Sequence, residues 1–311
     1  MRIAVFGAGG VGGYFGGRLA QSGQEVIFIA RGAHLEAMQR AGLRVDSLKG
    51  DFTVQPVQAT ADPAQAGPVE AVLLGVKAWQ VSEAARAMLP MIGEHTCVLP
   101  LENGVEAPEQ LADVLGVERV LGGLCHISAF VAAPGHIKHV GIEPHIALGE
   151  LDGRRSERAE KLRSALEGAG IWAEVPDDIQ VAMWEKFLFI AAISGVGAVT
   201  RAPAGVLRQV PGARGFLEEA MQEIYTLALA REINLPDGIV AKTLAFVDSL
   251  PPGVTASMQR DIMEGRPSEL ASQNGAVVRM AAQMGVAAPV NAYLYHSLLP
   301  QEMRARGELQ F

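Results

Sequence analysis

The chain has 311 residues, about twice the common size of a single domain, so its length favours two domains. Apolar residues make up 49% of the sequence, which is enough to build packed cores and excludes a disordered chain. The 26 basic and 34 acidic residues leave a formal net charge of −8, which argues against a protein that binds nucleic acids or anionic membranes.

The first half of the chain alternates short apolar runs with helical stretches. Five runs rich in valine, isoleucine and leucine are expected to be strands, at residues 2–6, 24–29, 71–76, 96–99 and 118–121. Four segments between them are expected to be helices, at residues 15–22, 33–41, 80–91 and 107–115. This alternation predicts an α/β fold in which a Rossmann-type, doubly wound parallel sheet carries helices on both faces.

The rest of the chain changes from mixed to purely helical character. Further elements are expected before residue 176: a hairpin at 43–48 and 51–57, strands within 137–148, an amphipathic helix within 152–170 and a last strand at 171–175. After Pro176 the periodicity is helical to the C-terminus, with Pro267 expected in the first turn of one helix. We therefore expect a Rossmann-like domain over 1–176 and an all-helical C-terminal domain over 177–311.

A glycine-rich motif, Gly7-Ala8-Gly9-Gly10-Val11-Gly12, follows the first expected strand and precedes a helix. This context is the one that dinucleotide binding requires, whereas the same motif elsewhere is weak evidence. Gly7 permits the tight turn, Gly9 lets the backbone approach a pyrophosphate, and Gly12 lets helix and strand pack closely. The motif predicts a dinucleotide site, with a glycine-rich turn that binds no ligand as the alternative.

The end of the second expected strand indicates which dinucleotide binds. NAD sites usually place Asp or Glu about 20 residues after the motif to hold the ribose 2′-hydroxyl. Here Ala30 and Arg31 occupy that place, and no acidic residue is near. A guanidinium pairs with a 2′-phosphate, so Arg31 favours NADP, unless it is simply a solvated surface arginine.

The apolar segment 179–200 contains only two charged residues, Glu185 and Lys186. A lysine in such surroundings either extends to water or faces a cleft, where partial burial would make it a usable acid. Glu269 follows Pro267, and on its own it is best explained as a first-turn glutamate that the helix dipole favours.

Other features exclude further classes of protein. Cys97 and Cys125 are too few for a disulfide framework or a four-cysteine zinc site, and they are typical of a reducing cytoplasm. No metal site is expected, because four neighbouring histidines show no ligand spacing: His126, His136, His139 and His145. The longest apolar run, 187–199, is shorter than the roughly 18 residues of a membrane span. Two apolar helices, 216–230 and 277–284, are expected in the core, with a homodimer contact as the alternative.

The motifs taken together resemble ketopantoate reductases (2-dehydropantoate 2-reductases), nearly from end to end. The segments that carry the resemblance keep their order and approximate spacing: Gly7 to Gly12, Arg31-Gly32 with His34-Leu35, Gly75-Val76-Lys77, Glu102-Asn103-Gly104, Trp184-Glu185-Lys186-Phe187, Ser257-Met258, Asp261-Ile262 and Glu269. Singly most of these motifs are weak, but as a set they are specific.

The resemblance implies NADPH-dependent reduction of 2-dehydropantoate to pantoate, on the route to coenzyme A. It implies that Lys186 is the general acid and that Glu269 forms hydrogen bonds beside it. It also implies that Lys77 and Asn103 lie near the cofactor and the reacting centre, and that Ser257 contacts the substrate. Without the resemblance, these three would be read as a surface lysine, a turn asparagine and an N-capping serine.

One departure from the family concerns the substrate. Well-known members place substrate-binding asparagines four and eight residues after the catalytic lysine, on one face of the helix. Here these positions hold Ile190 and Ser194, of which only Ser194 can form a hydrogen bond. A lost polar contact can change substrate choice. Reduction of a different 2-oxo acid is therefore the second hypothesis, and a non-catalytic NADP(H) sensor is the third.

Overall fold

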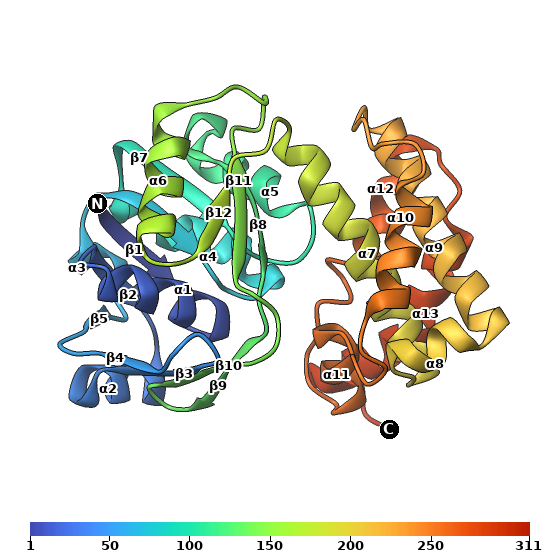
Figure 1. Cartoon of the computed structure of the whole chain (residues 1–311), viewed down its shortest axis with the longest axis horizontal. Coiled ribbons are helices and arrows are strands. Elements are labelled where there is room, and N and C mark those ends of the chain that lie inside the picture. The colour runs from blue at the N-terminus through green and yellow to red at the C-terminus, as the bar shows by residue number, and fades with distance from the viewer. The chain divides into compact units, whose positions relative to one another are not determined.

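The computed structural model describes residues 1–311, whose contacts separate into two compact units (Figure 1). The first unit contains Met1–Glu102 and Ala107–Ala182, and the second contains Asn103–Glu106 and Met183–Phe311. The short segment Asn103–Glu106 thus leaves the first unit and belongs to the second.

The first unit is built on a five-stranded parallel sheet with the order β5-β2-β1-β6-β7. The strands are β1 (Arg2–Phe6), β2 (Glu25–Ile29), β5 (Gln58–Thr60), β6 (Val69–Leu74) and β7 (Ile92–Pro100). In β1, Ile3 and Val5 enter one core cluster while Ala4 and Phe6 enter another, because alternate side chains point to opposite faces. The sheet therefore has a core on both faces, and the doubly wound α/β prediction is confirmed.

Helices cover both faces of this sheet (Figure 1). The first cluster includes side chains of α1 and α6, and the second includes side chains of α4 and α5. The helices of the unit are α1 (Gly10–Gln21), α2 (Gly32–Ala41), α3 (Pro63–Ala66), α4 (Val81–Ala87), α5 (Ala107–Leu115) and α6 (Glu157–Gly168). The helix expected at 15–22 begins earlier, because residues 10–13, three of which are glycines, already form its first turn.

Two smaller sheets complete the first unit, with the orders β4-β3-β10-β9 and β12-β11-β8. Their strands are β3 (Leu43–Ser47), β4 (Phe52–Val54), β8 (Gly122–His126), β9 (Ala129–Ala133), β10 (His136–His139), β11 (His145–Gly149) and β12 (Trp172–Glu174). The predicted hairpin is confirmed as the antiparallel pair β3–β4. The strand predicted at 118–121 is wrong: residues Val117–Arg119 form a 3₁₀ turn, and Val120 makes only an isolated bridge to Val98.

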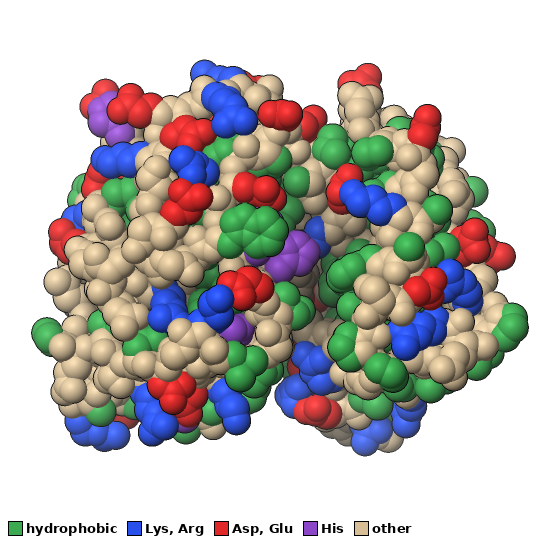
Figure 2. Space-filling model, in the orientation of Figure 1, with side chains coloured by type: hydrophobic (Ala, Val, Ile, Leu, Met, Phe, Trp, Pro, Cys, Tyr) green, Lys and Arg blue, Asp and Glu red, His purple; other side chains and the backbone are tan.

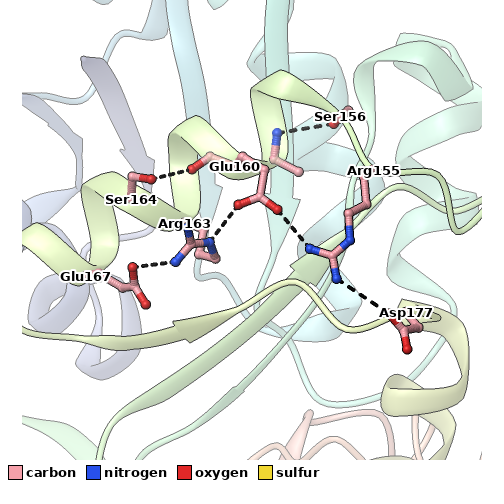
Figure 3. Close-up of polar contacts among 8 residues, drawn as sticks. Arg155, Ser156, Glu160, Arg163, Ser164, Glu167 and Asp177 are labelled. Atoms are coloured by element: carbon pink, nitrogen blue, oxygen red, sulfur yellow. Dashed lines mark hydrogen bonds and ion pairs between the residues drawn. The ribbon is translucent and has the colours of Figure 1, made fainter.

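The outer face of α6 carries a network of charged side chains (Figure 3). Glu160 accepts hydrogen bonds from Arg155 at 3.1 Å and from Arg163 at 2.8 Å. Arg163 also pairs with Glu167, and Arg155 lies 3.5 Å from Asp177 in the segment after β12. The hydrogen bond from Arg163 lowers the pKa of the Glu160 carboxyl. On the face seen in Figure 2, acidic and basic side chains are likewise interspersed.

The second unit is helical, as predicted for the C-terminal part of the chain. Its helices are α7 (Ile179–Thr200, which starts in the first unit), α8 (Ala204–Gln209), α9 (Pro211–Ala230), α10 (Ile239–Ser249), α11 (Ser257–Met263), α12 (Asn274–Met284) and α13 (Pro289–Ala305). The expected helix with Pro267 in its first turn is wrong. Residue 269 forms a bend and residues 270–273 form turns, and the next helix begins only at Asn274.

Helix α7 is longer than the apolar run 187–199 suggested. It has 22 residues and is long and apolar enough to cross a membrane by length and composition alone. However, 67% of its most apolar window is buried inside the structure, as in the core helix of a globular domain. Asp178 precedes the helix, and its carboxylate accepts hydrogen bonds from the N–H groups of Gln180 and Val181 at 2.8 and 3.1 Å.

Candidate active site

The glycine loop, Gly7-Ala8-Gly9-Gly10-Val11-Gly12, connects the end of β1 to α1. Gly7 has a φ of +97°, a conformation that other residues rarely adopt. A Cβ added at Gly7 would lie 2.8 Å from the carbonyl oxygen of Gly75, which follows β6. A Cβ added at Gly12 would lie 2.1 Å from the carbonyl oxygen of Gly7. Glycine at both positions therefore lets α1 pack directly against the ends of β1 and β6.

Gly9 differs from its neighbours, because a Cβ added there would meet no protein atom within 4 Å. Gly9 is also the N-cap of α1, and no side-chain hydrogen bond caps this helix. The first N–H groups of a helix carry partial positive charge and bind phosphates. By contrast, Gly10 packs against β9, where a Cβ would lie 2.3 Å from the carbonyl oxygen of Ala129. The geometry at Gly9 thus fits a pyrophosphate, between buried Ala8 and half-buried Val11.

Arg31 follows the carboxyl end of β2 and is the N-cap of α2. Its side chain is 66% exposed, and its Nη2 atom lies 3.8 Å from Oε1 of Glu83. An exposed ion pair at this distance contributes little, so the guanidinium can exchange the carboxylate for a phosphate. The arrangement at the end of β2 is compatible with a bound 2′-phosphate.

Lys77 lies at the end of β6 as expected, where it precedes a 3₁₀ turn (Ala78–Gln80). Its Nζ atom is 5.7 Å from the ring centre of Trp79. Nearby, the buried Glu102 accepts a hydrogen bond at 3.1 Å from the N–H group of Val76 and so connects the ends of β6 and β7. We assigned Glu102 no role from the sequence, although an acidic residue directly after an apolar strand was the available signal.

His34 on α2 is a second residue for which no role was predicted. Its Nδ1 atom accepts a hydrogen bond at 3.1 Å from the N–H group of Gly135. Burial lowers the pKa of His34, against the opposite effect of a hydrogen bond with the backbone of Ala8. His34 therefore connects α2 to the turn between β9 and β10. The only signal in the sequence was its place three residues after Arg31.

In the second unit, Asn103 and Glu269 meet although 166 positions separate them. The amide Nδ2 of Asn103 donates a hydrogen bond at 3.2 Å to Oε2 of Glu269, which is only 7% exposed. Gly104 follows with a φ of +122°, and a Cβ there would lie 3.0 Å from the carbonyl oxygen of Ser272. The segment after β7 thus packs against the turn that contains Glu269, and glycine makes this approach possible.

Lys186 lies on α7 and is half-buried, as is Ile190 one turn further along. Next to Lys186, Oε2 of Glu185 lies 3.8 Å from Nζ of Lys242 on α10. Ser194, two turns from Lys186, is fully buried, so its hydroxyl group does not reach the surface of the unit. The structure therefore leaves an aliphatic side chain, Ile190, as the accessible neighbour of Lys186 along this row of the helix.

Ser257 is the first residue of α11 and is half-buried. It is not the N-cap, because Ala256 occupies that position. The predicted site residues are thus distributed over both units. The glycine loop, Arg31 and Lys77 belong to the first unit, and the remaining residues belong to the second: Asn103, Lys186, Ser194, Ser257 and Glu269.

Comparisons with known proteins show where this arrangement belongs. Residues 3–153 match the family model "Ketopantoate reductase PanE/ApbA", and residues 178–302 match the model of its C-terminal part. The chain belongs to the ketopantoate reductase family. It is an oxidoreductase of that family, with a Rossmann-like sheet and a helical C-terminal part.

Two relatives and one structural neighbour illustrate what this chain is similar to. An uncharacterized oxidoreductase of Bacillus subtilis (strain 168), YkpB, is 30% identical over 96% of this chain and 98% of its own length. The crystal structure of 2-dehydropantoate 2-reductase from Geobacter metallireducens GS-15 is 33% identical, with a TM-score of 0.89 over 97% of this chain and 99% of that one. A D-mandelate dehydrogenase, solved with NADH and anilino(oxo)acetate, has a TM-score of 0.89 over 98% of this chain and all of that one. At 24% identity, it shows the shared fold alone.

Proposed function

We propose that the protein reduces the keto group of 2-dehydropantoate to give pantoate, with NADPH as the reductant. The contact between Asn103 and Glu269 carries this proposal, since it joins two distant predicted site residues within the unit that contains Lys186. The match over both parts of the ketopantoate reductase family supports it. In this function the protein would act in pantothenate and coenzyme A biosynthesis in the cytoplasm.

The cofactor would be held by residues of the first unit. The open space at Gly9 and the N-terminus of α1 suit the pyrophosphate, and Arg31 suits the 2′-phosphate. Lys77, at the end of β6, would lie near the cofactor, because ligands of such sheets bind at the carboxyl ends of the strands. NADPH would supply the hydride.

The protein's own groups would stabilise the charge that develops on the substrate. The Nζ atom of Lys186 would donate a proton to the carbonyl oxygen as negative charge develops on it. Asn103 and Glu269 would orient the substrate through hydrogen bonds, and the hydroxyl group of Ser257 would add another.

A second substrate class is favoured by Ile190. The half-buried Ile190 offers no hydrogen bond one turn after Lys186, and the hydroxyl group of Ser194 is buried. These two positions would then supply no hydrogen bond to the 4-hydroxyl group of 2-dehydropantoate. The alternative substrate is therefore a 2-oxo acid that lacks this hydroxyl group. A sensor that binds NADP(H) without catalysis is a third candidate, which the presence of Lys186 and Glu269 disfavours.

The first test compares two acids that differ by one hydroxyl group, 2-dehydropantoate and 3,3-dimethyl-2-oxobutanoate, with oxidation of NADPH as the readout. A higher kcat/KM for 2-dehydropantoate would support the main proposal, and a higher value for the other acid would support the second class. Binding of NADPH without turnover of either acid, or of a wider panel of 2-oxo acids, would contradict both and favour the sensor.

We predict that Lys186→Ala lowers kcat by roughly 10²–10⁴-fold, the usual contribution of a positioned general acid. Lys242→Ala is the matched control, since it removes the other lysine of the same unit. Single-turnover kinetics would measure the chemical step directly. If Lys186→Ala retained turnover near that of the wild type, Lys186 would not be the acid.

A further inference from the structure

Ser268, the residue before Glu269, is bound by two side chains at the end of the C-terminal helix α13: Glu302 in its last turn and Arg306 at its C-cap. The N–H group of Ser268 donates to both carboxylate oxygens of Glu302, at 3.1 and 3.0 Å. Its hydroxyl group donates to Oε2 of Glu302 at 2.5 Å, and its carbonyl oxygen accepts from Nη2 of Arg306 at 3.1 Å. Every polar group of the fully buried Ser268 is therefore bound by this pair.

Glu302, in the last turn of α13, and Arg306, the C-cap residue of this helix, also bind each other. Nε of Arg306 donates to Oε1 of Glu302 at 2.7 Å, and the side chain of Glu302 is only 4% exposed. Removing two charges from water is costly, and well-packed apolar side chains often stabilise a fold at least as well as a buried ion pair. What apolar side chains cannot do is fix the orientation of a particular peptide group. The pair is thus better explained by orientation than by stability.

Glu269 directly follows Ser268, so the contacts of Ser268 also restrain the backbone of Glu269. The hydroxyl group of Ser268 also accepts a hydrogen bond at 3.2 Å from the N–H group of Leu270, on the far side of Glu269. No helix fixes this backbone, since α12 begins only at Asn274. The carbonyl oxygen of Glu269 accepts hydrogen bonds from the N–H groups of Ser272 and Gln273 at 3.1 and 3.0 Å, which hold the far side of the residue. Ser268 holds the near side, and so contributes to the direction of the Glu269 side chain toward Asn103.

We propose that Glu302 and Arg306 are positioning residues, which act through Ser268 to aim the carboxylate of Glu269 at Asn103. This inference rests on the proposed role of Glu269 in the active site. It gives the last helix of the chain a part in the reaction, although neither of its two residues would touch substrate or cofactor.

The test is a double-mutant cycle with Glu302→Gln and Glu269→Gln. Glu302→Gln keeps the shape and one carbonyl oxygen of the side chain but removes the charge that binds Arg306. We expect it to lower kcat by about 10- to 100-fold, the scale on which small misplacements act, with a smaller effect on KM. In the Glu269→Gln background, the same change should lower kcat less than about twofold, whereas the drop in melting temperature should be equal in both backgrounds.

The matched control is Asp248→Asn, which breaks the ion pair of Asp248 with Arg214, a contact of 2.5 Å elsewhere in the second unit. It should lower the melting temperature and leave kcat unchanged. If Glu302→Gln fails to fold, Arg306→Lys and Ser268→Ala are milder changes to the same contacts, with the same expected pattern.

The outcomes separate this inference from the proposed function. Unchanged kcat in Glu302→Gln, or equal losses in both backgrounds, would overturn the positioning role while Glu269 kept its own. Wild-type activity of Glu269→Gln would instead overturn the proposed role of Glu269, and the positioning role with it.

Discussion

At the scale of single residues, two glycines of the loop have different reasons to be glycine. Gly12 is needed for close packing, whereas at Gly9 only a bound ligand would exclude a side chain. Gly9 has φ −69° and ψ −160°, which any residue adopts, and no protein atom lies within 4 Å of an added Cβ. We predict that Gly9→Ala changes the free energy of unfolding by less than about 0.5 kcal/mol. It should weaken NADPH binding more than about tenfold, because the backbone can no longer approach the pyrophosphate.

The control for this prediction is Gly12→Ala, whose Cβ would lie 2.1 Å from the carbonyl oxygen of Gly7. Forcing an extra methyl group into such a contact costs about 1–3 kcal/mol of stability. Chemical denaturation and fluorescence titration with NADPH measure the two effects. Equal affinity of Gly9→Ala and the wild type for NADPH would mean that no phosphate approaches this position.

Arg31 should distinguish NADPH from NADH. A hydrogen bond to a charged group contributes about 1.5–3 kcal/mol, so Arg31→Ala should weaken NADPH binding by roughly 10- to 100-fold and NADH binding much less. Arg44→Ala is the matched control, because Arg44 has a similar exposure, 63% against 66%, and also pairs with a carboxylate. Equal losses of affinity for both cofactors would show that Arg31 does not bind the 2′-phosphate.

The sequence was most informative where function depends on neighbours in the chain. The spacing in the glycine loop identified Gly7 and Gly12, whose close contacts lie within one strand–turn–helix unit. It could not identify the contact of Asn103 with Glu269, because 166 residues separate the two. For the same reason, only the fold reveals that Ser268 lies against Glu302.

At the scale of elements, the N-terminus of α6 is stabilised by one serine, the N-cap residue Ser156. The hydroxyl oxygen of Ser156 accepts a hydrogen bond from the N–H group of Ala159 at 3.3 Å and caps the helix (Figure 3). We predict that Ser156→Ala lowers the free energy of unfolding by about 1 kcal/mol, the usual value of such a cap.

Ser164 provides the comparison within α6. Its hydroxyl group donates to the carbonyl oxygen of Glu160 at 2.8 Å on the exposed face of the helix interior, where alanine has the higher helix propensity. Ser164→Ala should therefore be neutral or slightly stabilising in urea denaturation. Similar destabilisation by both substitutions would show that the cap of Ser156 contributes nothing specific.

The helix predicted to start near Pro267 shows where local pattern is insufficient. Ser268 is bound by Glu302, 34 positions further along the chain, and a pattern of neighbouring residues cannot reveal such a contact. The chain forms a bend and turns over residues 269–273, and α12 begins at Asn274. Long periodic segments such as α5 were predicted correctly, because their pattern does not depend on distant partners.

At the scale of the whole molecule, the carboxyl groups of the first unit determine the response to acid. Four of them have a lowered pKa: Asp46, Glu70, Glu150 and Glu160. In three of these, the largest cause is a hydrogen bond from an arginine or lysine side chain. For Glu150, burial acts to raise the pKa, and the hydrogen bonds from Arg158 and Ser156 together with nearby positive charges outweigh it.

A lowered pKa in the folded state means that the unfolded chain binds more protons in acid. The stability that these groups contribute is therefore present above their unfolded pKa of about 4 and is lost as the pH falls through the lower folded values. We predict a progressive loss of unfolding free energy between about pH 5 and about pH 3. Urea denaturation at several pH values measures this, and Glu70→Gln should make the dependence shallower. Stability that stays constant over this range would contradict the prediction.

The assignment of Asn103–Glu106 to the second unit has a consequence for protein synthesis. A ribosome adds roughly 5–20 residues per second, so about 10–30 seconds separate the appearance of Asn103 from that of Glu269, 166 residues later. The strands of the first unit can pair during this interval, while Asn103 has no acceptor. Any nascent or truncated chain that stops before residue 269 contains Asn103 but lacks Glu269. The contact between the two is therefore among the last in the molecule to form.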